Sequence, residues 1–137
     1  MDRSSLTQQQ KFIAFKNAFS TYSHYTSRGE HLAAFVVAFS ILEDRLGGMW
    51  IVRKGIAGES SSGFTPFTRK LKYLFKHGDI GVQERKDWEA AAWNRNAKLH
   101  NAMWNLGEFS ADDCETILKC ARSADRLRRQ QKRGVKS

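Results

Sequence analysis

The sequence contains only one proline and two cysteines in 137 residues, and it has no long apolar run. So little proline favours helices, because proline breaks a helix interior. The two cysteines, Cys114 and Cys120, lie six positions apart on one expected helix, where they are badly placed to form a disulfide with each other. We therefore expect two free thiols and a reducing compartment.

No segment has the pattern of a targeting signal or a membrane span. The first ten residues, MDRSSLTQQQ, lack the basic and then apolar order of a secretory signal. The most apolar run, residues 32–42, is too short to cross a bilayer. We expect a cytoplasmic protein with no membrane association.

The chain also lacks strand-like alternation longer than a few residues, and it has no internal repeat. Start and stop signals instead divide it into helices over residues 6–25, 28–54, 66–77, 80–106 and 111–132. The expected N-terminal caps are Ser5, Ser27, Thr65, Asp79 and Ser110, and the expected C-terminal caps are Gly55, Gly78, Gly107 and Gly134. The predicted fold is all-α, a single domain over residues 1–137 built as a bundle of about five helices.

The second expected helix is apolar nearly all round, over HLAAFVVAFSILEDRL. This composition is typical of the central helix of a bundle. Glu43 follows Phe39 by four positions, which puts a carboxylate in line with apolar neighbours.

Charge is distributed unevenly along the chain. The formal net charge is +9, and residues 119–137 hold eight bases against one acid, so +7 of the total lies there. Bases at a helix end suit the helix dipole, which explains the first two or three of them. The excess predicts salt-sensitive RNA binding by a basic tail that begins at about residue 126. The expected RNA-binding residues are Lys98, Arg126, Arg128, Arg129, Lys132 and Arg133.

The segment WNRNAKLHNAMW places polar residues on an otherwise apolar helix. The apolar stripe recurs at spacings of three and four and consists of Trp88, Ala92, Leu99, Ala102 and Leu106, with Arg95 in its middle. A guanidinium there needs an anion, either the carboxylate of Glu43 or a ligand phosphate. Asn96 and His100 share the adjoining edge, with His100 about 140° round the helix from Arg95.

These side chains suit phosphate chemistry. Histidine can move a proton near neutral pH, and arginine offers a planar fork to phosphate oxygens. The four histidines and two cysteines show no metal-ligand spacing, so we expect no metal and no cofactor. A purely structural interpretation is also open, in which Arg95 pairs with Glu43 and His100 caps a neighbouring carbonyl group.

The pattern R-N-x-x-x-H at Arg95-Asn96-Ala97-Lys98-Leu99-His100, preceded by a hydrophobic helix that ends in an acidic turn at Glu43, resembles the HEPN superfamily. The likeness covers roughly residues 28–132. Members of that superfamily are small helical bundles that often dimerise. Many are metal-independent endoribonucleases that act as toxins, antiviral defence effectors or RNA-processing factors, and others only bind RNA or a partner.

The resemblance implies roles for individual residues. Arg95 is expected to grip the scissile phosphate, His100 to act as general base or acid, and Asn96 to assist them. Glu43 is expected to hold Arg95 or line the cleft. The implied partners are RNA, a second copy of the chain, and an antitoxin or regulatory protein. Ala102 stands where toxins silenced by nucleotide transfer carry a tyrosine, which argues against that form of control.

The non-catalytic alternative makes its own prediction. If Arg95 is structural, Arg95→Ala should destabilise the fold strongly, because Glu43 would be left buried and unpaired. Among the tryptophans of this region, we expect Trp88 in the core, and Trp93 and Trp104 at an interface or cleft wall.

Overall fold

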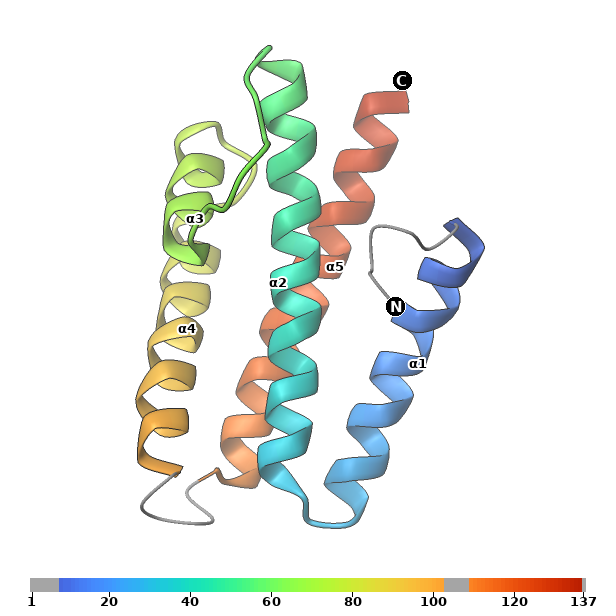
Figure 1. Ribbon diagram of the computed structural model, residues 1–137, viewed down its shortest axis with the longest axis vertical. Coiled ribbons are helices and arrows are strands. Elements are labelled where there is room, and N and C mark those ends of the chain that lie inside the picture. Colours follow the sequence, from blue (N-terminus) through green and yellow to red (C-terminus); the bar gives the residue numbers. More distant parts are fainter. Residues whose placement is uncertain (1–7, 103–108, 137) are drawn as a thin grey trace.

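The computed structural model describes residues 8–102 and 109–136 and consists of five helices in those ranges (Figure 1). They are α1 (Gln8–Ser27), α2 (His31–Ile56), α3 (Phe67–Lys76), α4 (Val82–Ala102) and α5 (Ala111–Lys136). The described ranges contain no strand. The prediction of an all-α fold with about five helices is confirmed.

The centre of the bundle is α2, which packs along α5. Helix α1 lies on one side of this pair, and α3 and α4 lie together on the other side (Figure 1). Neighbours therefore surround α2 on several sides, which explains why its sequence is apolar nearly all round.

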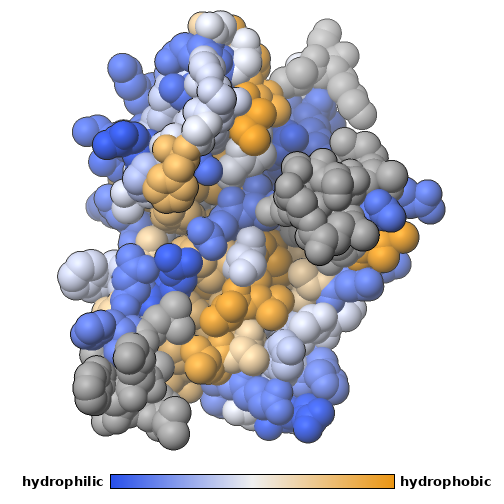
Figure 2. Space-filling model, in the orientation of Figure 1, coloured by the Kyte–Doolittle hydropathy of each residue, from blue (hydrophilic) through white to orange (hydrophobic). Residues whose placement is uncertain are grey.

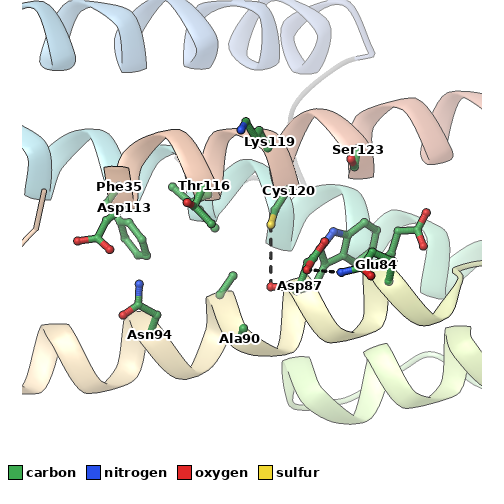
Figure 3. A pocket seen from close by; sticks show the side chains of 14 residues that line it. Phe35, Glu84, Asp87, Ala90, Asn94, Asp113, Thr116, Lys119, Cys120 and Ser123 are labelled. Carbon is green, nitrogen blue, oxygen red and sulfur yellow. Dashed lines mark hydrogen bonds between the residues drawn. The ribbon is translucent and has the colours of Figure 1, made fainter. Parts of the chain in front are cut away.

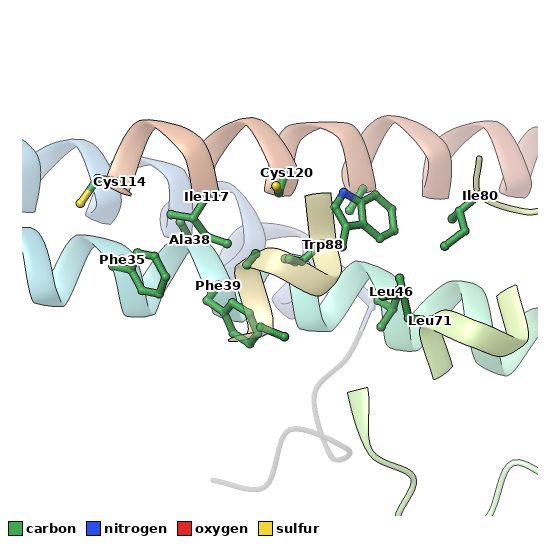
Figure 4. Packing of buried hydrophobic residues seen from close by; sticks show 14 of the residues in the cluster. Phe35, Ala38, Phe39, Leu46, Leu71, Ile80, Trp88, Cys114, Ile117 and Cys120 are labelled. Atoms are coloured by element: carbon green, nitrogen blue, oxygen red, sulfur yellow. The ribbon is translucent and has the colours of Figure 1, made fainter. Parts of the chain in front are cut away.

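A single hydrophobic core joins the helices (Figure 4). Phe35 and Phe39 of α2 belong to the same buried cluster as Leu71 of α3, Trp88 of α4 and Ile117 of α5, and each is at most 1% exposed. Burial of a large apolar side chain stabilises a fold by about 1.5–3 kcal/mol. The prediction that Trp88 lies in the core is confirmed.

The start of α5 has the cap that its sequence predicts. The Ser110 hydroxyl accepts a 3.1 Å hydrogen bond from the Asp113 amide, and the Asp113 carboxylate accepts a 2.9 Å bond from the Ser110 amide. This reciprocal arrangement is a capping box. The predicted C-terminal cap at Gly78 is also confirmed. Gly78 follows α3 and has a left-handed backbone with φ 79°.

Several other predicted helix ends are wrong. Ser27 closes α1, where its hydroxyl donates to the His24 carbonyl, and α2 begins after Glu30 without a side-chain cap. Gly55 and Gly134 lie inside helices, so α2 and α5 both run further than predicted. The first left-handed glycine after α2 is Gly58, with φ 72°. Ser5 and Gly107 lie outside the described residues.

The remaining two predicted caps are also displaced. The N-terminal cap position of α3 is Pro66 rather than Thr65, and no side-chain hydrogen bond caps this helix. Asp79 does not cap α4, since its carboxylate accepts hydrogen bonds from Arg53 of α2.

Both cysteines are free, as predicted, and the structure buries both of them. Burial raises the pKa of Cys114, and burial followed by the charge of Asp87 raises the pKa of Cys120 to about 11. Neither thiol is a ready nucleophile in this environment.

Within the ranges that the structure covers, no helix combines the length and apolar character needed to cross a membrane.

Candidate active site

The guanidinium of Arg95 lies between α4 and α2, over an aromatic ring. Its central carbon is 4.4 Å from the centroid of the Phe39 ring, a cation–π distance. Its Nε and Nη2 atoms lie 3.3 and 3.2 Å from Asn96 Oδ1. The side chain is fixed in this way yet 34% exposed, so some of its donors face solvent.

The predicted contact between Arg95 and Glu43 is confirmed, but it is loose. Arg95 Nη1 lies 3.5 Å from Glu43 Oε1, whereas strong charge-assisted hydrogen bonds measure about 2.7–2.9 Å. The Glu43 side chain is 45% exposed. The expectation that loss of Arg95 would leave Glu43 buried is therefore wrong, because water can hydrate this carboxylate.

His100 lies in the last turn of α4 and is exposed. Five residues of helix separate its Cα from that of Arg95 by about 9 Å. No hydrogen bond or ion pair joins the two within the part of the chain that the structure describes. One chain thus carries the Arg95 guanidinium and the His100 imidazole on one helix without bringing them into contact.

Lys98 is held at a different place from the other residues of the motif. Its ammonium forms an ion pair with Asp113 of α5 and lies 5.8 Å from the centroid of the Phe109 ring. Burial alone would raise the pKa of Asp113, but hydrogen bonds from Lys98 and Ser110 outweigh it and lower that pKa. The predicted RNA-binding residue Lys98 therefore connects the C-terminal part of α4 to the first turn of α5.

The basic tail is a continuation of α5. Arg126 and Arg133 are exposed, as is Lys132, while Arg129 pairs with Asp125 at 3.1 Å. Arg128 is instead partly buried against α2, where burial lowers its pKa and its guanidinium contacts Gln131. Four of the five predicted tail residues are thus exposed, and Arg128 is partly buried.

Both helices that hold the Arg95 contacts also carry exposed apolar side chains. Leu32 and Val36 of α2 are 43% and 42% exposed. Trp93 of α4 is 76% exposed and lies on the side of the helix that carries His100, about 160° round from Arg95. Figure 2 shows apolar side chains gathered over the half of α2 nearer its start. Exposure of Trp93 agrees with the expected place at an interface or cleft wall, whereas Trp104 lies outside the described residues.

A separate groove of about 520 Å³ lies between α4 and α5 (Figure 3). Phe35 and Trp88 form part of its floor, and its rim carries Glu84, Asp87 and Asp113 against the single base Lys119. This excess of carboxylates disfavours a polyanion. The groove is therefore not part of the candidate site for RNA.

No protein family, no characterised protein and no solved structure matches this chain. Geometry and side-chain chemistry therefore carry the functional argument.

Two parts of the site escaped the sequence interpretation. The contact of Arg95 with the Phe39 ring was missed, although the spacing of Phe39 and Glu43 puts both on one face of α2. The second omission is α3, whose sequence FTRKLKYLFK contains four bases and no acid. Summing charge over all residues before the tail concealed this local excess.

Proposed function

We propose that this chain is a HEPN-like endoribonuclease that cleaves RNA without a metal ion and leaves a 2′,3′-cyclic phosphate and a 5′-hydroxyl. The state of Arg95 carries the proposal. Its guanidinium is oriented by Phe39 and Asn96, but its contact with Glu43 is long and half exposed. A phosphate can replace that carboxylate at little cost and gain a bidentate partner.

The reaction assigns one step to each group. His100, acting as general base, takes the proton of a ribose 2′-hydroxyl, and the 2′-oxygen attacks the adjacent phosphorus. The bond from phosphorus to the 5′-oxygen breaks, and the leaving oxygen takes a proton from a histidinium. Arg95 stabilises the additional negative charge on the phosphoryl oxygens in the transition state. Proton transfer contributes about 10²- to 10⁴-fold in rate.

A second copy of the chain completes this site in the proposal. Within one chain, His100 diverges from Arg95 by about 140° round α4. Leu32 and Val36 on α2, and Trp93 on the same side of α4 as His100, are exposed apolar side chains on which two copies can pack. A two-fold arrangement supplies two histidines to one cleft, one as base and one as acid.

The test of the reaction is cleavage of single-stranded RNA in EDTA by the purified protein. Arg95→Ala and His100→Ala should each lower the rate at least about 100-fold. His24→Ala is the matched control, because His24 is an exposed histidine on α1. Mass spectrometry of the products should find 2′,3′-cyclic phosphate ends. Unchanged cleavage in both site variants would refute the proposal.

The test of the dimer is the mass of the protein in solution, measured by light scattering. Val36→Asp and Trp93→Asp should each convert a dimer to a monomer, because they place charge in an apolar interface. Ile13→Asp is the control, since Ile13 is an apolar residue on α1 that is 47% exposed, close to the 42% of Val36. A monomeric wild-type protein would contradict the two-chain site.

The non-catalytic alternative is an RNA-binding or partner-binding helical module. The ion pair of Lys98 with Asp113 favours it, because one base of the motif already has a structural partner. On this alternative the protein binds RNA in EDTA without cutting it. A toxin, defence or RNA-processing role, and an antitoxin partner, follow only if cleavage is found.

A further inference from the structure

Three bases form one exposed face of α3. Arg69, Lys72 and Lys76 follow one another at spacings of three and four, so they lie within about 60° of one another round the helix. Leu71 and Leu74 occupy the opposite side and are buried in the core. Figure 2 shows hydrophilic side chains along the edge of the molecule where Figure 1 places α3.

This face is uniformly positive. The polar side of an amphipathic helix usually mixes both signs of charge, but α3 has no acid. The fourth base, Lys70, turns toward α2 and lies 5.0 Å from the centroid of the Trp50 ring. In the described ranges, none of the three outward bases forms an ion pair with a carboxylate. These three positive charges are therefore free to bind an external polyanion.

Helix α3 begins beside the candidate active site. Phe67, the first residue of α3, has its ring centroid 5.5 Å from that of Phe39, and Phe39 is the ring under Arg95. From Arg69 to Lys76 the helix then rises about 10 Å, the length of about three stacked nucleotides. Phe67 faces the core as Leu71 and Leu74 do, so an RNA strand held at Arg95 would pass round the start of α3 to reach the three bases.

One aromatic side chain precedes this face in the chain. Phe64 is 93% exposed, although large aromatic side chains are normally buried at least in part. Phe64 precedes Arg69 by only five residues. Proteins hold single strands with exposed rings and rows of cations, since a ring stacks on a base and the cations follow the backbone.

We infer that Arg69, Lys72 and Lys76, with Phe64, bind the single-stranded RNA that extends from the Arg95 site. The inference rests on the proposed function in that RNA is the ligand. The basic end of α5 is a separate surface, because it packs on α2 through Arg128 and through Gln131, whose amide donates to the Met49 carbonyl. A membrane is a poorer partner for α3, because its apolar side is already buried in the core.

The experiment compares two triple variants that remove the same charge with the same spacing. One is Arg69→Gln, Lys72→Gln and Lys76→Gln on α3. The other is Arg126→Gln, Arg129→Gln and Arg133→Gln on α5. Affinity for an unstructured eight-nucleotide RNA is measured by fluorescence anisotropy from 50 to 300 mM salt. All proteins carry His100→Ala, so that the RNA stays intact.

The α3 variant should bind about 10- to 100-fold more weakly at 100 mM salt, with a salt dependence reduced by about two units of slope for three lost phosphate contacts. Phe64→Ala should weaken binding about tenfold with little change of slope. The α5 variant should lose clearly less affinity for so short an RNA.

Three results would overturn the inference. The first is an α3 variant that binds like the parent protein. The second is equal loss in the two triple variants, since that indicates an effect of net charge alone. The third is binding to phosphatidylserine vesicles, but not to RNA, that depends on the α3 bases.

Failure of the proposed reaction is a distinct outcome. A wild-type protein that binds RNA through α3 but does not cut it supports the inference and contradicts the nuclease. A wild-type protein that cuts RNA, combined with an α3 variant that binds RNA as tightly as the parent protein, supports the nuclease and contradicts the inference.

Discussion

Arg53, near the end of α2, donates two hydrogen bonds of 2.7 Å to the carboxylate of Asp79, which lies between α3 and α4. The Asp79 side chain is only 8% exposed. The planar fork of arginine matches both carboxylate oxygens at once. This pair fastens the turn between α3 and α4 to the central helix, and it is far tighter than the contact of Arg95 with Glu43.

Arg53→Lys should therefore destabilise the protein by about 1–3 kcal/mol, because lysine cannot replace the bidentate bond to a mostly buried carboxylate. Urea unfolding followed by circular dichroism measures this loss. Arg28→Lys is the control, since the pair of Arg28 with Glu30 is exposed, and it should change stability by about 0.5 kcal/mol or less. Equal effects of the two variants would show that the fork geometry is unimportant.

Arg95→Ala should cost only about 1 kcal/mol of stability, because Glu43 is half exposed and the remaining losses are one cation–π contact and exposed hydrogen bonds to Asn96. In a double-mutant cycle with Glu43→Ala, the coupling energy should stay below about 1 kcal/mol. A loss above about 3 kcal/mol would mark Arg95 as a structural residue and favour the non-catalytic alternative.

Ionisation of Cys120 should weaken the fold at alkaline pH. Its pKa is raised from 9.0 to about 11 in the folded protein, so below pH 9 the thiol is protonated in both states. Between about pH 9 and 11 the unfolded chain loses this proton while the folded chain keeps it, which lowers the free energy of unfolding. Cys120→Ala removes this contribution, so the stability advantage of the wild type over the variant should shrink across that range. An advantage that stays constant would contradict the raised pKa.

The two adjacent glycines of α2 should respond differently to alanine. A Cβ at Gly47 meets only Lys70 Nζ at 3.9 Å, so Gly47→Ala should stabilise the helix by about 0.5–1 kcal/mol. A Cβ at Gly48 would lie 2.8 Å from Arg128 Nε, and the Arg128 side chain must move away. Gly48→Ala should therefore gain less or lose stability. Thermal unfolding compares the two, and equal gains would mean that the packing of Arg128 contributes nothing.

Local signals predicted the fold better than its boundaries. Ser110 was placed correctly, because a capping box needs only residues three positions apart. Gly134 and Asp79 were misplaced, because distant contacts decide their surroundings. Helix α5 continues past the end predicted at residue 132 and includes Gly134. Just before this extension, α5 packs on α2 through the hydrogen bond from Gln131 to the Met49 carbonyl. Asp79 pairs with a residue 26 positions earlier in the chain, which no local pattern reveals.

The candidate site was partly predictable for the same reason. Helical spacing placed Arg95 in an apolar stripe and named Glu43 as its internal partner, and that contact exists. Spacing within one helix could not predict the ring of Phe39 under Arg95 or the nearness of α3, because both depend on how three helices pack. The exposure of Glu43 was likewise a property of the assembled bundle.

Burial of both cysteines, described above for its effect on their pKa, also leaves the molecular surface without a reactive thiol. A single cysteine introduced at an exposed position, such as Ser23 of α1, can thus carry a spin label at a unique place. Pulsed electron paramagnetic resonance then reads the distance between two labels whenever two chains associate. The orientation of two copies can thus be measured without first replacing the native cysteines.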